Sequence, residues 1–133
     1  MVNVEISGDT RYPLNRKIVR SAVFETLAKN KISDANIEVS VTVVGRRKMD
    51  KLTGDFMKDN KKHEVLSFPF EELTGNMSHG FINHPDGVLR LGDIVLCWPY
   101  VLDAAGVDDV LVDDEVYMLV SHSVEHLLGK HHE

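Results

Sequence analysis

Two histidines near the end of the chain, His122 and His126, have the spacing of paired metal ligands. Residues four apart on an α-helix project from the same face about one turn apart, so two imidazoles there can share one tetrahedral ion. Gly129 follows where helices commonly end in a left-handed residue, and a turn there brings His132 to a third position. Three neutral nitrogens that leave a position for water are typical of catalytic zinc, because structural zinc is usually closed by four protein ligands. We therefore predict one Zn²⁺ ion held by His122, His126 and His132. Other divalent transition metals that accept imidazoles, such as nickel or iron, are the alternative.

The alternative interpretation is that these histidines bind no metal. A pair four residues apart occurs on solvated helix surfaces, and His131 and His132 would then be part of a polar tail. His131 is also a second candidate for the third ligand. Met118, one turn before His122, is expected in the core or in the wall of the site, because a thioether suits softer metals.

The spacing of the three histidines also matches that of metzincin proteases. Those enzymes need a glutamate directly after the first histidine as general base, and here that position holds Ser123. Glu125 directly precedes the second histidine, and one residue along a helix turns a side chain about 100° away from that ring. A peptidase is therefore the weaker hypothesis.

Apolar periodicity places these residues on a series of alternating elements. Alternation with a period of two predicts strands, and apolar residues three and four apart predict helices. We expect strands over 2–6, 37–43, 65–68 and 91–97, and a loop over 71–90 with a tight turn at 86–87. We expect helices over 18–27, 100–105 and 114–127, and another after Gly45 and before the polar break at 59–60. Asn15 and either Asp113 or Asp114 are the expected helix caps, Phe56 is expected on a buried helix face, and Gly106 is an expected helix end. This order predicts one α/β domain over 1–133: a small mixed, mostly parallel sheet covered by helices, with the metal site on the last helix and the following turn.

Composition limits the class of protein. The chain has 133 residues, 43% of them apolar, which suffices for one core, and no stretch reaches the roughly 20 apolar residues that cross a bilayer. We expect a soluble cytoplasmic protein in which Cys97 is a buried, unreactive thiol. The net charge of −6 repels a polyanion at long range. Lys and Arg are nevertheless concentrated in segment 46–62. This segment forms either a local basic face or ordinary solvated helix surface.

Three segments resemble, in the same order, motifs of the YbeY family. Residues 122–132 (HSVEHLLGKHH) are similar to the family signature His-Gly-x-Leu-His-Leu-x-Gly-Tyr-Asp-His. Residues 64–70 (EVLSFPF) resemble the stretch Val-Leu-Ser-Phe-Pro, and 91–95 (LGDIV) resemble the Gly-Asp-Ile strand. The family spacing favours His132 over His131 as the third ligand.

The resemblance implies a single-strand-directed endoribonuclease that matures the 3′ end of small-subunit ribosomal RNA and takes part in ribosome quality control. It implies a monomer whose partners are precursor RNA and the ribosome or its assembly factors. Zinc would lower the pKa of a bound water towards neutrality and accept phosphoryl charge; no general base is evident. Ser67 could hydrogen-bond a phosphate and Asp93 could orient a metal-bound histidine, although both also suit structural roles at a turn and a strand end.

The chain departs from the family at one position with a proposed substrate role. About eight residues before Val-Leu-Ser-Phe-Pro the family has an arginine thought to serve substrate phosphate, and Met57 stands there. A thioether cannot make the paired contacts of a guanidinium, and Arg47 and Lys58 are candidates to supply the charge. A second hypothesis is therefore a ribosome-associated metal-binding protein with weak or no nuclease activity. In either case the metal is expected to anchor the residues up to Glu133.

Overall fold

The computed structural model describes residues 1–32, 36–59, 61–70 and 87–129, and its centre is one four-stranded sheet. The strands are β1 (Val2–Gly8), β2 (Asn36–Val44), β3 (Val65–Pro69) and β4 (Val88–Cys97), in the order β1-β2-β4-β3. The pairs β1–β2 and β2–β4 are parallel, and β3 runs antiparallel to β4 at one edge. The predicted mixed, mostly parallel sheet is confirmed.

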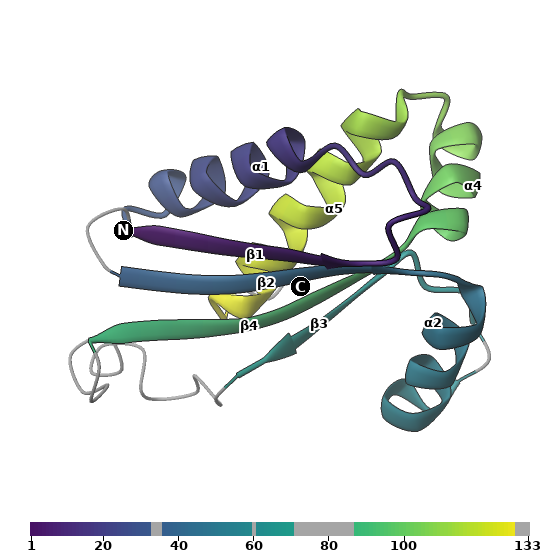
Figure 1. The fold of residues 1–133 in the computed structure, drawn as a ribbon, viewed down its shortest axis with the longest axis horizontal. Coiled ribbons are helices and arrows are strands. Elements are labelled where there is room, and N and C mark those ends of the chain that lie inside the picture. The colour runs from purple at the N-terminus through teal and green to yellow at the C-terminus, as the bar shows by residue number, and fades with distance from the viewer. Residues whose placement is uncertain (33–35, 60, 71–86, 130–133) are drawn as a thin grey trace.

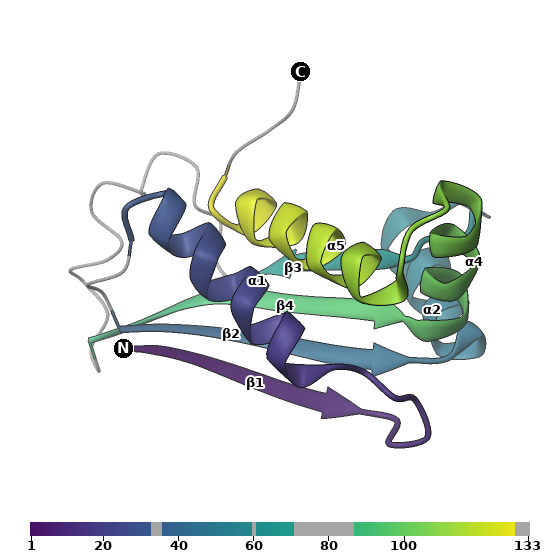
Figure 2. The same cartoon turned by 90° about the horizontal axis from the view of Figure 1, so that it is seen from above.

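The helices divide between the two faces of this sheet (Figures 1 and 2). Helices α1 (Arg16–Lys29) and α5 (Val112–Leu127) lie side by side over one face. Helix α2 (Arg46–Leu52) and the π-helical turn η1 (Thr53–Met57) lie on the other, beyond the carboxyl end of β2, and α4 (Trp98–Asp108) joins β4 to α5. None of the helices among the described residues is long and apolar enough to cross a bilayer.

The main core lies between the sheet and helices α1 and α5. Along β2 every second side chain is buried there, and the intervening polar ones face the other way, as the two-residue period of a strand requires. Six members of this core that are fully buried are Val19, Val23, Ile37, Val39, Val41 and Val120. A smaller cluster around Met49, Val95 and Tyr100 packs beneath α2 and includes Cys97. Burial raises the pKa of that thiol, as expected for an unreactive cysteine.

A bulge in β4 changes which of its side chains face the main core. The register with β2 shifts between Glu38 and Val39, so that β4 carries one extra residue at this point. Leu89 and Leu91 face the core before the shift, and Ile94 and Leu96 face it afterwards. Asp93 and Val95 consequently point to the face away from α5.

Gly92 sits at this bulge and permits a close approach of three elements. Its φ is +149°, and a Cβ there would lie 2.2 Å from the carbonyl oxygen of Phe68 on β3 and 3.0 Å from Leu127 Cδ2 on α5. Only glycine avoids both the backbone strain and the contact. This position therefore holds the carboxyl end of α5 close to strands β3 and β4.

The amino ends of the two long helices are linked by a hydrogen bond. Asn15 caps α1 as predicted, since its Oδ1 accepts from the amides of Lys17 and Ile18 at 3.1 and 3.4 Å. Helix α5 begins at Val112, and its N-cap is Leu111 rather than Asp113 or Asp114. Asp113 instead lies in the first turn and accepts from Asn15 Nδ2 at 3.0 Å. An acidic residue there also interacts favourably with the helix dipole.

Two further element boundaries differ from the predictions. Helix α4 spans 98–108 instead of 100–105, because Pro99 is tolerated in a first helical turn and Gly106 does not end the helix. It ends at Asp109, which has φ +57°. Strand β4 starts at Val88, three residues before the predicted start. The rest of the predicted loop, 71–86, lies outside the described residues.

The second predicted helix is correct at its start and wrong at its end. Met49 is fully buried, as expected, but Phe56 is 62% exposed. The reason is the π turn: the amide of Lys58 donates to the Thr53 carbonyl, five residues back, at 2.9 Å. A wider turn rotates later side chains away from the face predicted by a 3.6-residue period.

The close approach at Gly92 makes a stability prediction. We expect Gly92→Ala to lower the free energy of unfolding by about 2 to 4 kcal/mol, because the Cβ meets backbone that cannot move without disturbing β3. Gly106→Ala is the matched control: it lies in α4 and a Cβ there meets nothing within 4 Å. Urea unfolding should show that control unchanged or stabilised by up to about 1 kcal/mol. Equal stability of the two variants would contradict the role given to Gly92.

Candidate metal centre

Helix α5 has one face in the core and the histidines on another. Val116, Val120, Val124 and Leu127 form the buried stripe that the sequence predicts, each at most 1% exposed. His122 is exposed and His126 is half-buried. Packing of the stripe against the sheet therefore fixes the orientation of both imidazoles without enclosing them.

The two rings lie close together at the end of this helix. Their Nε2 atoms are 2.9 Å apart, the ring centroids are 4.6 Å apart, and the ring planes are inclined by 47°. Two ring nitrogens at this distance need a proton or a cation between them, because their lone pairs repel each other. A tetrahedral zinc ion about 2.0–2.1 Å from each nitrogen would separate them by about 3.3 Å. A small adjustment of the rings therefore suffices, and the pair fits a transition-metal ion.

The chain turns directly after the histidines. The amide of Gly129 donates to the carbonyl of His126 at 2.9 Å, and Gly129 has φ +82°. The predicted left-handed glycine is therefore present. His131 and His132 lie outside the described residues, and within those residues no three His, Cys, Asp or Glu side chains are grouped to hold a metal. His132 as third ligand stays a prediction.

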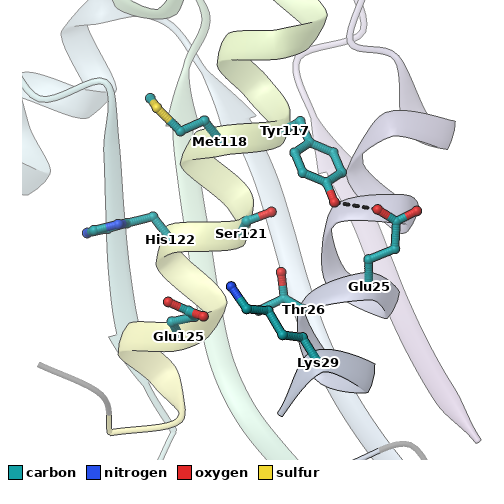
Figure 3. A pocket seen from close by; sticks show the side chains of 8 residues that line it. All are labelled: Glu25, Thr26, Lys29, Tyr117, Met118, Ser121, His122 and Glu125. Carbon is teal, nitrogen blue, oxygen red and sulfur yellow. Dashed lines mark hydrogen bonds between the residues drawn. The ribbon is translucent and has the colours of Figure 1, made fainter. Parts of the chain in front are cut away.

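A groove of about 460 Å³ runs between α1 and α5 beside His122 (Figure 3). Glu25 and Lys29 border it from α1, and Tyr117, His122 and Glu125 border it from α5. The hydroxyl of Tyr117 donates to Glu25, and this hydrogen bond, with burial, raises the pKa of the phenol. Tyr117 is therefore a neutral donor and spacer that ties the helices together. Thr26, Met118 and Ser121 complete the lining.

The residues around the pair weaken the protease hypothesis. Ser123, at the position of a metzincin base, is 3% exposed on the core side of α5. No side chain at that position would reach a metal held by the outer face. Glu125 borders the same groove as His122. Met118 is 50% exposed and forms part of the groove wall, one of its two expected places.

The structure separates the other candidate residues from one another. Ser67 lies on β3, half-buried, on the face of the sheet that α5 covers. Asp93 points to the opposite face and accepts a hydrogen bond from the hydroxyl of Ser40. Because the sheet lies between Asp93 and α5, the structure does not place this carboxylate where it would orient a histidine.

The expected substrate cations are also distant from the histidines. Arg47 on α2 and Lys58 after η1 are exposed on the side of the sheet away from α5, as is Met57. Lys29, which the sequence did not single out, is the cation that borders the groove beside His122 among the described residues. Glu25 and Lys29 are spaced as an exposed face of α1, but no sequence signal says that this face adjoins the histidines.

Comparisons with known proteins agree with the motifs. The family model described as Endoribonuclease YbeY matches residues 6–133. Endoribonuclease YbeY of Renibacterium salmoninarum is 32% identical over 99% of this chain and 81% of its own length, and that of Caldicellulosiruptor saccharolyticus is 33% identical over 87% and 73%. A solution structure of TM1509 from Thermotoga maritima has the same fold, with a TM-score of 0.57 at 22% identity, covering 98% of this chain and 75% of that one. The chain belongs to the Endoribonuclease YbeY family.

Proposed function

We propose that this chain is a zinc-dependent endoribonuclease that cleaves single-stranded precursor ribosomal RNA in the cytoplasm, as a monomer that visits the ribosome or its assembly factors. Its relatives are named endoribonucleases. The observation that carries the metal dependence is the 2.9 Å separation of the Nε2 atoms of His122 and His126 on the outer face of α5. Family spacing adds His132 as the third ligand.

The ligands and the helix together favour a cation at this place. His126 lies in the last turn of α5, where the partial negative charge of the helix carboxyl end attracts a positive ion. Zinc bound by three imidazoles supplies a Lewis acid that activates water and accepts phosphoryl charge. The protein's part is to keep both imidazoles aligned by burying the opposite face of α5.

The groove beside His122 is the place for the RNA backbone. Lys29 supplies a positive charge there, which suits a phosphate, and Tyr117 keeps α1 at a fixed separation through Glu25. A groove between two helices supports a single-strand preference, because protein recognition of specific RNA mostly targets unpaired segments.

One observation favours the second candidate, a ribosome-associated metal-binding protein with weak nuclease activity. Met57 occupies the family arginine position, and neither Arg47 nor Lys58 lies on the histidine side of the sheet. On that hypothesis the metal mainly stabilises the carboxyl end of the chain, and RNA cleavage is slow.

The first test is cleavage of a single-stranded RNA oligonucleotide. We expect His122→Ala and His126→Ala to lower the cleavage rate by more than about 100-fold, since even groups that only support metal ligands matter by about 10- to 100-fold. A chelator should have the same effect on the wild type. His63→Ala is the histidine control, because His63 contacts Asp59 on the α2 side at 3.2 Å. Cleavage that survives in His126→Ala would indicate a contaminating nuclease and remove support for the proposal.

The second test concerns the metal itself. Elemental analysis should find about one zinc per chain, and none in a variant lacking His122, His126 and His132. Zinc should slow amide exchange over 130–133, because a ligand in that segment joins it to α5. Exchange in β1 serves as the internal control. If exchange over 130–133 is the same with zinc and with chelator, His132 is not a ligand.

The third test restores the family arginine. Met57 is 49% exposed, so Met57→Arg should fold normally. We expect kcat/KM for RNA to rise by about tenfold, because a charge-assisted hydrogen bond to phosphate contributes about 1.5 kcal/mol or more. Met57→Gln, of similar length but uncharged, should not show the gain. A Met57→Arg variant no faster than Met57→Gln would show that position 57 makes no phosphate contact in this chain.

A further inference from the structure

The sheet face opposite α5 carries a second hollow, of about 560 Å³. Helix α2 and turn η1 cover only the end of this face near the carboxyl end of β2. The floor of the hollow is mixed: Ser40 and Thr42 from β2 and Asp93 from β4 lie beside the apolar side chains of Val44 and Val95. Phe56 and Phe68 form a wall, and Lys48 of α2 stands at the rim. We call this hollow the sheet groove.

The wall of the sheet groove is an aromatic pair. The rings of Phe56 and Phe68 meet edge to face with centroids 5.3 Å apart. Phe56 is 62% exposed because the π turn rotates it outwards, so its ring face is accessible beside the floor. An exposed aromatic face next to basic residues is the arrangement on which unpaired nucleobases stack.

Lys48 belongs to a segment whose net charge has the opposite sign to that of the whole chain. Segment 46–62 carries seven Lys and Arg against three Asp, a net charge of +4 in a chain whose net charge is −6. The basic residues are Arg46, Arg47, Lys48, Lys51, Lys58, Lys61 and Lys62. Of these residues Lys48 lines the sheet groove, whereas Arg46 and Lys62 lie over the ring of Tyr100, 6.0 and 5.8 Å from its centroid.

The floor of the sheet groove suits the edge of a base better than a phosphate. Asp93 accepts the Ser40 hydroxyl through Oδ1, which leaves Oδ2 as an acceptor towards the groove. A carboxylate repels phosphate and acidic peptides, but it accepts a hydrogen bond from an amino group such as cytosine N4. Thr42 hydroxyl, 3.2 Å from that of Ser7, adds a group that can donate or accept.

We propose that the sheet groove binds a nucleotide of single-stranded RNA, with its base stacked on Phe56, the base edge at Asp93 and Ser40, and the adjoining phosphate near Lys48. The inference rests on the proposed function, because it names where the same RNA is held outside the metal centre. Aromatic wall, carboxylate floor and basic rim together favour RNA over an acidic protein segment, which would meet Asp93 at the floor.

The position of the sheet groove gives the proposal a length dependence. The sheet groove and the histidines lie on opposite faces of the sheet, and β3 is the edge strand between them. One RNA strand that occupies both places must pass around this edge, so it must contain several nucleotides. Cleavage of long oligonucleotides should therefore depend on the sheet groove, whereas cleavage of di- and trinucleotides at the histidines should not.

The test is fluorescence anisotropy with a labelled single-stranded cytidine 12-mer, in a chelator so that no cleavage occurs. We expect Phe56→Ala to weaken binding by about 5- to 50-fold with an unchanged salt dependence, because stacking involves no counterion release. Lys48→Ala should weaken binding and reduce the slope of log K against log salt by about 0.7, the value for one phosphate contact on a single strand. Both side chains are exposed, so both variants should fold.

Matched controls come from α1, on the other face of the sheet. Phe24→Ala removes an aromatic ring that is 43% exposed, and Lys17→Ala removes an exposed lysine. Neither should change affinity or salt slope. Phe56→Tyr, which keeps a ring for stacking, should bind as the wild type does, whereas Phe56→Leu should resemble Phe56→Ala.

Base preference tests the floor. The wild type should bind the cytidine 12-mer more tightly than a uridine 12-mer, because uracil has no amino group to donate to Asp93. Asp93→Asn should reduce this preference by about threefold or more, since an amide can also donate to a uracil carbonyl. An unchanged preference in Asp93→Asn would contradict the placement of the base edge at the floor of the sheet groove.

The outcomes separate this inference from the proposed function. Wild-type affinity in Phe56→Ala and Lys48→Ala overturns the RNA assignment, and the sheet groove is then a surface for another class of partner, such as protein. Normal cleavage by the wild type in that case leaves the metal-dependent nuclease intact. Groove-dependent binding by a chain that cleaves no RNA with zinc present supports the sheet groove and contradicts the nuclease.

Discussion

The constraint on which this structure depends is the burial of one stripe of α5 against the sheet. Val116, Val120, Val124 and Leu127 bury together, and the 3.6-residue period then directs His122 and His126 outwards as a pair. Gly92 extends this constraint to the sheet, because its missing side chain lets Leu127 and strand β3 approach β4. Fold stability and the alignment of the histidine pair therefore share the same contacts, so damage to the core at this end of α5 should also disturb this pair.

Sequence predicts local features with strong chemistry and misses those set by the surroundings. The histidine pair, the left-handed Gly129 and the Asn15 cap each follow from spacing and residue type, and the structure has them. Phe56 was misplaced because a π turn breaks the period on which its position was predicted. Which charged residues lie near His122 depends on the packing of α1 beside α5. No local pattern contains that information, so the sequence favours Arg47 as the cation for substrate phosphate and does not single out Lys29.

The bulge in β4 shows how one extra residue changes a functional interpretation. The sequence makes Asp93 a candidate to orient a histidine, because it follows Gly92 in a motif shared with the family. The spacing of the apolar residues Leu89, Leu91, Ile94 and Leu96 contains a three-residue step, which two-residue alternation does not allow. The sequence alone does not reveal this step, because 94–97 are all apolar and either alternation fits them. The bulge places Asp93 on the side away from α5, beside Ser40.

On the proposals above, one face of the sheet binds RNA and the other cleaves it, in a protein whose net charge is negative. Long-range attraction is unfavourable at a net charge of −6, so affinity must come from local positive charge and from contacts that do not depend on salt. Segment 46–62 supplies the first, and the exposed ring of Phe56 supplies the second. At the proposed metal centre, Lys29 and a bound cation would attract phosphate at short range. On the proposed arrangement, the basic residues of segment 46–62 would stay away from a bound dication, whose binding their charge would oppose. Loss of the family arginine at Met57 is then tolerable if the binding face, rather than one guanidinium, holds the strand.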